Sequence, residues 1–316
     1  MIPLNPDRST FGRHETFPLR FGWLTKGHQA WSENPDVFEQ DEATVTLGVG
    51  KNMVSAIKYW MLATQIVKHD KTVLRPAELG NKLFDEDGWD PYLEDDATIW
   101  LLHWLLASNP VDATAIFWFF NRFHKPEFTA DELIHALKTF VAENLTSRAS
   151  ESTLKHDVAL LIRMYQPATV SKSVPLEESL DSPFVLLGLI RPMPETKRYE
   201  SKPDYRPQLP VAVLAFAVAE LFAHFGEPNL PVERLMRSDG SLAAPGSVFR
   251  LTEECLIAKL EEMIEWLPGR LQLRESAGIH ELYRLADFTP LEMLRMHYED
   301  VFEINPKIKS LEIESK

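Results

Sequence analysis

The most apolar part of the chain is Ile99-Trp-Leu-Leu-His-Trp-Leu-Leu-Ala107, which Ser108-Asn-Pro-Val-Asp112 separates from Ala113-Thr-Ala-Ile-Phe-Trp-Phe-Phe120. Each run is shorter than the roughly 20 residues that a helix needs to cross a bilayer. The two runs therefore predict buried helices, over 95–108 and 112–123, rather than a membrane span. Within the first run, His103 is expected to be a hydrogen-bonded core residue and not a metal ligand.

Helical periodicity also dominates the rest of the chain, and alternating runs are few. The further predicted helices are 19–33, 51–69, 130–144, 152–166, 210–225, 252–267 and 290–301, and the predicted strands are 71–74, 247–251 and 270–274. Thr129 and Glu132 form a capping-box signature, and Asp95 with Asp96 favours the start of a helix. The fold class is therefore predicted to be mainly α.

A similar order of elements recurs three times, beginning near Leu19, Asp112 and Pro210. Each stretch contains two helices, a third amphipathic helix and a turn-rich or β segment. This order predicts tandem winged-helix-like (helix-turn-helix) modules with a few short β strands. The alternative is an unrelated helical bundle.

The clearest internal boundary is a proline-rich segment. Residues 166–210 hold eight of the 22 prolines, which predicts an extended connector, although its apolar run 184–190 is expected to dock on the core. We therefore expect three parts. They are an N-terminal winged-helix-like, DNA-contacting module over 1–108, a central helical module over 109–175, and the connector with a C-terminal helical or winged-helix-like domain over 176–316.

Composition excludes several classes of protein. The chain has 316 residues, a single cysteine (Cys255) and a formal net charge of −14. One cysteine excludes an intramolecular disulfide and a cysteine-based zinc site. The first residues lack the pattern of a secretory signal, so a cytoplasmic protein without membrane contact is expected. The acidic total argues against a generic nucleic-acid binder.

The segment 8–28 departs locally from this acidity. It carries Arg8, Arg13, Arg20 and Lys26 against one acid, Glu15. Guanidinium groups match the oxygens of a phosphate, and interleaved aromatic residues can stack on nucleotides. The segment therefore predicts a phosphate-contacting surface, and the alternative is that its aromatic residues are core and its charges structural.

A second basic candidate is the helix predicted after the glycine turn Gly48-Val-Gly50. One face of this helix carries Lys51, Asn52, Ser55 and Lys58. Such a face resembles a recognition helix, in which Asn reads adenine and Lys contacts guanine or phosphate. A plain solvated face is the alternative.

The third candidate is acidic. The segment 85–96 contains seven carboxylates and no base, and thus supplies half of the net charge. Its spacing does not match an EF-hand, because Leu83 and Pro91 occupy ligand positions. One option is a looser Mg²⁺ site that uses two of Asp85, Asp87, Asp90 and Glu94 with waters, and the last three are the predicted ligands. The other option is a solvated turn leading into a capped helix.

No standard nuclease, zinc-protease or serine-hydrolase motif is present. However, Phe11–His28, Leu47–Met53, Asp87–Asp95 and Thr98–Trp104 together resemble the SspB-like DNA nickase family of bacterial DNA phosphorothioation (Ssp) defence systems. The likeness covers most of the chain to about residue 300. It is densest in the first 110 residues.

The resemblance implies a Mg²⁺-dependent DNA nickase (endonuclease) that acts in phosphorothioate modification and phage defence. Its implied partners are DNA, a cysteine desulfurase, an ATP-pyrophosphatase-like sulfur transferase and an ATPase, and it allows a homodimer. In this hypothesis His14 and Glu15 are the catalytic pair. The residues that contact DNA are Arg13, Arg20, Lys26, Lys51, Asn52, Ser55 and Lys58. The alternatives are a non-catalytic winged-helix DNA-binding adaptor or regulator, and an acidic scaffold that contacts only proteins.

Overall fold

The computed structural model describes residues 1–70, 73–166 and 182–304. It confirms the mainly α prediction, because helices dominate and the described strands form antiparallel sheets of two or three strands. No helix in these residues is long and apolar enough to cross a membrane.

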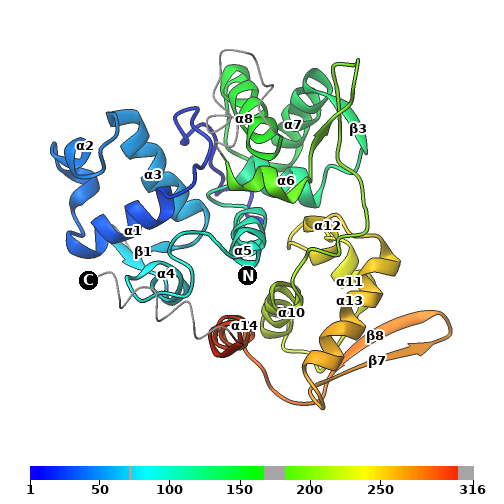
Figure 1. The fold of residues 1–316 in the computed structure, drawn as a ribbon. Helices are drawn as coiled ribbons and strands as arrows, with labels where there is room; N and C mark the ends of the chain where they lie inside the picture. The colour runs from blue at the N-terminus through cyan, green and yellow to red at the C-terminus, as the bar shows by residue number, and fades with distance from the viewer. Residues whose placement is uncertain (71–72, 167–181, 305–316) are drawn as a thin grey trace.

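Helix α5 (Asp96–Ala107) lies between three groups of helices and strands, as Figure 1 shows. One group precedes α5 in the chain, and the other two follow it as a central unit and a C-terminal unit. The predicted cap is present, since the Asp95 side chain accepts a hydrogen bond from the Ala97 N–H. All residues of α5 after Asp96 are buried, which explains why this helix has no polar stripe. Its environment is protein on every side.

The imidazole of His103 joins α5 to two of these groups. Its Nδ1 accepts a hydrogen bond from the Tyr165 hydroxyl of α8 (Glu151–Tyr165) at 2.8 Å, and its Nε2 donates to the Val248 carbonyl of α12 (Pro245–Val248) at 2.9 Å. Both nitrogens are therefore satisfied, and His103 is the core histidine that the sequence predicts.

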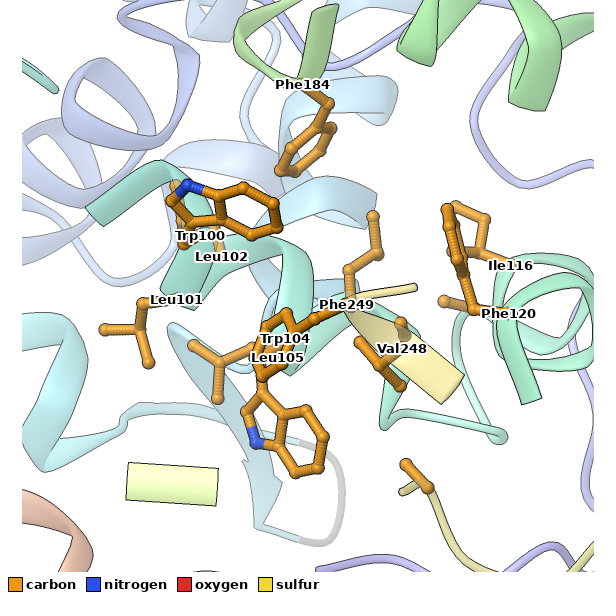
Figure 2. Packing of buried hydrophobic residues seen from close by; sticks show 14 of the residues in the cluster. Trp100, Leu101, Leu102, Trp104, Leu105, Ile116, Phe120, Phe184, Val248 and Phe249 are labelled. Atoms are coloured by element: carbon orange, nitrogen blue, oxygen red, sulfur yellow. The ribbon is translucent and has the colours of Figure 1, made fainter. Parts of the chain in front are cut away.

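Aromatic side chains from several elements surround this histidine. Trp100 and Trp104 of α5 pack against Phe249, and Phe120 approaches His103 edge-on at 4.6 Å between ring centroids. Figure 2 shows that these side chains and Phe184 come together from α5, from α6 (Thr114–Asn121), from the 3-10 helix η2 (Pro183–Leu187) and from the end of α12. The groups thus share one continuous core.

The first group precedes α5. Its elements are α1 (Trp23–Glu33), the 3-10 helix η1 (Val37–Glu39), α2 (Ala43–Thr46), α3 (Lys51–Ala63), the hairpin β1 (Val67–Asp70) and β2 (Val73–Pro76), and α4 (Glu78–Phe84). Helix α1 packs on α3 at Gly27, where a Cβ atom would lie 2.6 Å from the Met61 sulfur. Glycine at this position therefore permits the close helix–helix approach.

The second and third groups repeat one order of elements: helix, strand, helix, helix, strand, strand. The central unit contains α6, β3 (Glu127–Thr129), α7 (Ala130–Asn144), α8, β4 (Arg191–Pro192) and β5 (Arg198–Glu200). The C-terminal unit contains α10 (Val211–Phe225), β6 (Asn229–Pro231), α11 (Val232–Met236), α13 (Glu253–Trp266), β7 (Leu271–Ser276) and β8 (Ile279–Arg284), with α12 as an additional turn of helix before α13. In both sheets the last strand is central, so the two units share one topology.

The chain ends on helix α14 (Pro290–Ile304), which returns to pack on α10. Helix α14 thereby lies beside the C-terminal unit and also reaches the acidic segment before α5 (Figure 1).

Several predicted boundaries are confirmed and others are corrected. The capping box of Thr129 and Glu132 opens α7, and the apolar run 184–190 docks on the core through Phe184, Leu187 and Ile190. The helix predicted over 51–69 ends at Ala63, because Gln65 adopts a left-handed conformation (φ 59°) and the chain turns into β1.

The strand predicted over 247–251 is wrong. Pro245 stands in the first turn of α12, where proline favours a helix, and the carbonyl of Val248 at the end of that turn is held by His103. The prediction at 71–74 lies partly outside the described residues, and 73–74 belong to β2. The strand predicted at 270–274 corresponds to β7.

Burial lowers the pKa of His103 to about 3, so the folded state keeps this imidazole neutral where the unfolded chain protonates it. We therefore expect stability to fall as pH decreases below about 6.5, by up to roughly 1.4 kcal/mol per pH unit from this group. His103→Gln should lower the free energy of unfolding by about 1–3 kcal/mol at pH 8, and this deficit should shrink toward pH 5. Urea titrations at both pH values measure the difference. The matched control is His135→Gln at an exposed position of α7, and an unchanged pH slope in His103→Gln would contradict the assignment.

Candidate functional site

The basic N-terminal segment lies across two groups of the fold. The Thr10 N–H donates to Thr114 Oγ1 at 2.9 Å, and the Gly12 N–H donates to Asp157 Oδ1 of α8 at 3.2 Å. Farther along, Trp60 Nε1 of α3 donates to the Phe17 carbonyl at 3.0 Å. The segment therefore joins α3 of the first group to α6 and α8 of the central unit.

His14 is the buried centre of this segment, with only 1% of its surface exposed. Its Nδ1 accepts a hydrogen bond from the Thr16 N–H at 3.1 Å, so Nε2 carries the proton and donates to Asp157 Oδ1 at 3.1 Å. The ring stacks on Trp60 with centroids 6.4 Å apart. Both ring nitrogens are therefore engaged in hydrogen bonds within the fold.

The neighbours of His14 have the opposite environment, since the side chains of Arg13 and Glu15 are exposed. Glu15 and Thr16 adopt left-handed backbone conformations, with φ of 50° and 64°. Such conformations are strained for residues other than glycine and persist only where surrounding contacts impose them. The buried His14 thus anchors a strained loop that presents one guanidinium and one carboxylate to solvent.

Arg20 and Lys26 lie beyond this loop. The Arg20 guanidinium sits over the Trp23 ring at 5.5 Å from its centroid. Trp23 is buried, whereas Phe21 is 40% exposed and offers the accessible ring of this stretch. Lys26 is exposed and lines a shallow cavity of about 360 Å³ together with Tyr92. A cation and an exposed aromatic ring thus line one cavity, a combination that suits single-strand contacts, although the acidic Glu33 lines it too.

Helix α3 presents its predicted polar face at its first two turns. Lys51, Asn52 and Ser55 are exposed, while Lys58 is half-buried and forms an ion pair with Glu39. The helix begins after Gly50 with no side-chain cap and no acid in its first turn. Its amides and macrodipole therefore add to the positive potential of Lys51.

The predicted Mg²⁺ ligands lie in different environments. Asp90 is buried, and its carboxylate accepts hydrogen bonds from the Glu94 N–H (2.8 Å), the Asp95 N–H (3.1 Å) and the Thr98 hydroxyl. It thus stabilises a turn. Asp87 and Glu94 are exposed, and no group of three His, Cys, Asp or Glu in 1–70, 73–166 and 182–304 could hold a metal ion. A Mg²⁺ site that uses two carboxylates of this segment with waters stays a prediction.

The acidic segment instead anchors α14, an association that the sequence analysis missed. The Thr98 hydroxyl is 2.7 Å from the Tyr298 hydroxyl, and the Asp95 carboxylate is 2.8 Å from His297 Nε2. Burial alone would raise the pKa of Asp95, but hydrogen bonds from His297 and from its own helix hold it below the ordinary value. About 200 residues separate these partners, so no local signal could reveal them.

Residues 11–298 match the family described as protein of unknown function (DUF4007), and the chain belongs to that family. Among solved structures, magnesium ion-bound SspB has a TM-score of 0.82 to this chain, and a second SspB structure has one of 0.80. Both are 32% identical to this chain, and each match covers 94% of it and 90% of SspB. No curated protein matches. The chain is an SspB-like member of its family, which confirms the resemblance seen in the sequence.

The His14–Asp157 pair yields a stability prediction. His14→Leu leaves a buried carboxylate without its imidazole donor, in a site where Asp157 Oδ2 has no hydrogen-bond partner among the described residues. We expect a loss of about 1–3 kcal/mol in the free energy of unfolding. The double variant His14→Leu, Asp157→Leu should lose less than the sum of the single variants. The exposed neighbour His156→Leu is the matched control, and additive losses would show that the pair does not interact.

Proposed function

We propose that this protein is a DNA-nicking endonuclease of a phosphorothioation and phage-defence system of the Ssp type. The observation that carries the proposal is the likeness to SspB along 94% of the chain at 32% identity. In this proposal the protein is cytoplasmic and works with a cysteine desulfurase, an ATP-pyrophosphatase-like sulfur transferase and an ATPase. The magnesium ion in one SspB structure supports Mg²⁺ as the cofactor to test.

The proposed DNA-contacting surface consists of Arg13, Arg20, Lys26, Lys51, Asn52, Ser55 and Lys58. Arg13, Lys26 and Lys51 are exposed cations that can neutralise backbone phosphates, and the side chain of Asn52 is exposed as well. Lys58 is the weakest member, since Glu39 already pairs with it. Strand scission also needs a group that activates water or the leaving oxygen.

For that group we propose Glu15. Its carboxylate is exposed beside Arg13, and the strained loop fixes its position through the buried imidazole of His14. In this proposal His14, the other member of the predicted catalytic pair, is the positioning residue for Glu15. For Mg²⁺ the exposed carboxylates of Asp87 and Glu94 stay the candidate ligands, whereas the Asp90 carboxylate is already engaged in hydrogen bonds with the turn after it.

We further propose that the two units of equal topology are winged-helix-like. Their order, with the last strand central in a three-stranded sheet, supports this interpretation. The central unit then extends from the predicted start at 109 to Glu200, because β5 pairs with β3. The third helix of the C-terminal unit, α13, carries five glutamates and one lysine. That charge makes it unsuited to a DNA groove and suited to a protein partner.

A non-catalytic DNA-binding adaptor or regulator remains the second candidate. It is favoured by one observation, the lack of a three-residue metal cluster in the described part of the chain. An adaptor and a nickase both shift DNA in a gel. Only a nickase converts supercoiled plasmid to open circles.

The plasmid assay is therefore the deciding experiment. We expect the purified chain to nick supercoiled plasmid in Mg²⁺ and not in EDTA, and Glu15→Gln to slow nicking by at least about 100-fold. Glu254→Gln, at an exposed position of α13, is the matched control and should nick normally. DNA binding with plasmid left supercoiled would establish the adaptor. Undiminished nicking by both His14 and Glu15 variants would remove these residues from the proposal.

The salt dependence of DNA binding tests the surface separately from the chemistry. Arg13→Ala and Lys51→Ala should each weaken duplex binding and reduce the slope of log K against log salt by about 1, since each removes one phosphate contact. The control is Arg295→Ala on α14, which is exposed outside the proposed surface. Fluorescence anisotropy at several salt concentrations measures the slope. Equal slopes in all variants would place DNA elsewhere.

A further inference from the structure

A second cationic site lies between the central and C-terminal units. It is a cavity of about 430 Å³, and none of its lining residues comes from the first 108 residues. Its polar lining includes His124, Ser201, Arg237 and Arg250, while Met236 and Leu251 contribute apolar surface. No aspartate or glutamate lines it among the described residues.

Arg250 is the buried cation of this lining and is only 5% exposed. Its guanidinium donates to the carbonyls of Phe119 (2.9 Å), Phe120 (3.3 Å) and Phe123 (3.2 Å) at the end of α6, and to Ser201 Oγ (3.2 Å). The negative end of the helix dipole stabilises this charge. All of these partners are neutral, however, and Arg250 forms no ion pair with a described carboxylate. A buried cation of this kind gains from a bound anion.

Further positive charge surrounds Arg250. Burial lowers its pKa to about 10, and the nearby guanidinium of Arg206, itself buried, adds to this effect. Arg237 is exposed at the end of α11 and has no described ion pair. Burial and the charges of Arg250 and Arg237 together lower the pKa of His124. The nearby carboxylate of Asp204 partly offsets the effect of burial on the pKa of Arg206, but Asp204 does not line the cavity.

We propose that this cavity binds a phosphate group, supplied by a nucleotide or by the backbone of DNA. The guanidinium of Arg237 offers a planar pair of donors, and Arg250 supplies the buried charge behind it. The Ser201 hydroxyl accepts from Arg250, so its own proton is available for a phosphate oxygen. The apolar wall of Met236 and Leu251 leaves room beside the phosphate for a sugar or base. The proposal stands whether or not the protein nicks DNA.

Calorimetry on the full chain tests the site with three probes: inorganic phosphate, adenosine monophosphate and a short DNA duplex. At least one should bind and also raise the melting temperature with concentration. Arg237→Ala and His124→Ala should each weaken this binding about tenfold or more, and Arg237→Lys should restore part of it. Both side chains are exposed, so the variants should keep the wild-type circular dichroism spectrum. Lys197→Ala, at an exposed turn between β4 and β5, is the matched control and should bind normally.

The probes also identify the source of the phosphate. Tighter binding of the mononucleotide than of inorganic phosphate, without competition from duplex, would identify a nucleotide site. A duplex affinity that falls in Arg237→Ala and is competed by inorganic phosphate would identify a backbone contact. Failure of all three probes to bind, or binding that neither Arg237→Ala nor His124→Ala weakens, would overturn the proposal. Neither failure bears on nicking, which the Glu15 variant reports.

Discussion

The fold depends on how one imidazole is satisfied inside an aromatic core. His103 stands on a helix that is buried on all sides, and it exchanges hydrogen bonds with Tyr165 of the central unit and Val248 of the C-terminal unit. Burial makes an unpaired polar group costly, so both partners must be in place at once. This requirement fixes α8 and α12 around α5. The relative position of the repeated units thus follows from a polar contact as well as from hydrophobic packing.

The same principle operates at the surface that we propose for DNA. A buried pair, His14 with Asp157, holds a loop whose outer residues are charged and exposed. Stable burial on one side of the loop compensates for backbone strain on the other. The net charge of −14 averages over these local differences, so it is a poor guide to the partners that the chain binds. Acidic residues concentrate before α5 and on α13, and positive groups concentrate in the N-terminal loop and in the cavity at Arg250.

Sequence reasoning succeeded where the signal was local. Helix α7 was predicted at its true limits because the capping box of Thr129 and Glu132 marks its start. Reasoning failed where a distant partner decides the local structure. The segment 247–251 looks extended, yet Pro245 starts a turn of helix whose last carbonyl, that of Val248, is held by His103 from 145 residues away. For the candidate site, sequence identified Arg13 and Glu15 as neighbours but could not show that His14 between them is buried.

The sequence by itself determined the mainly α class, the buried helix around His103, the docking of the run 184–190 and the family to which the chain belongs. These features follow from periodicity, capping and residue patterns that lie within short stretches of chain. Only the tertiary structure shows that the Asp90 carboxylate accepts hydrogen bonds from its own turn and that Asp95 contacts His297. It also shows that Arg250 lines one cavity with Arg237 and His124. Whether a charged side chain is free for function depends on which distant groups satisfy it. Contacts across 100 to 200 residues leave no spacing that a sequence can show.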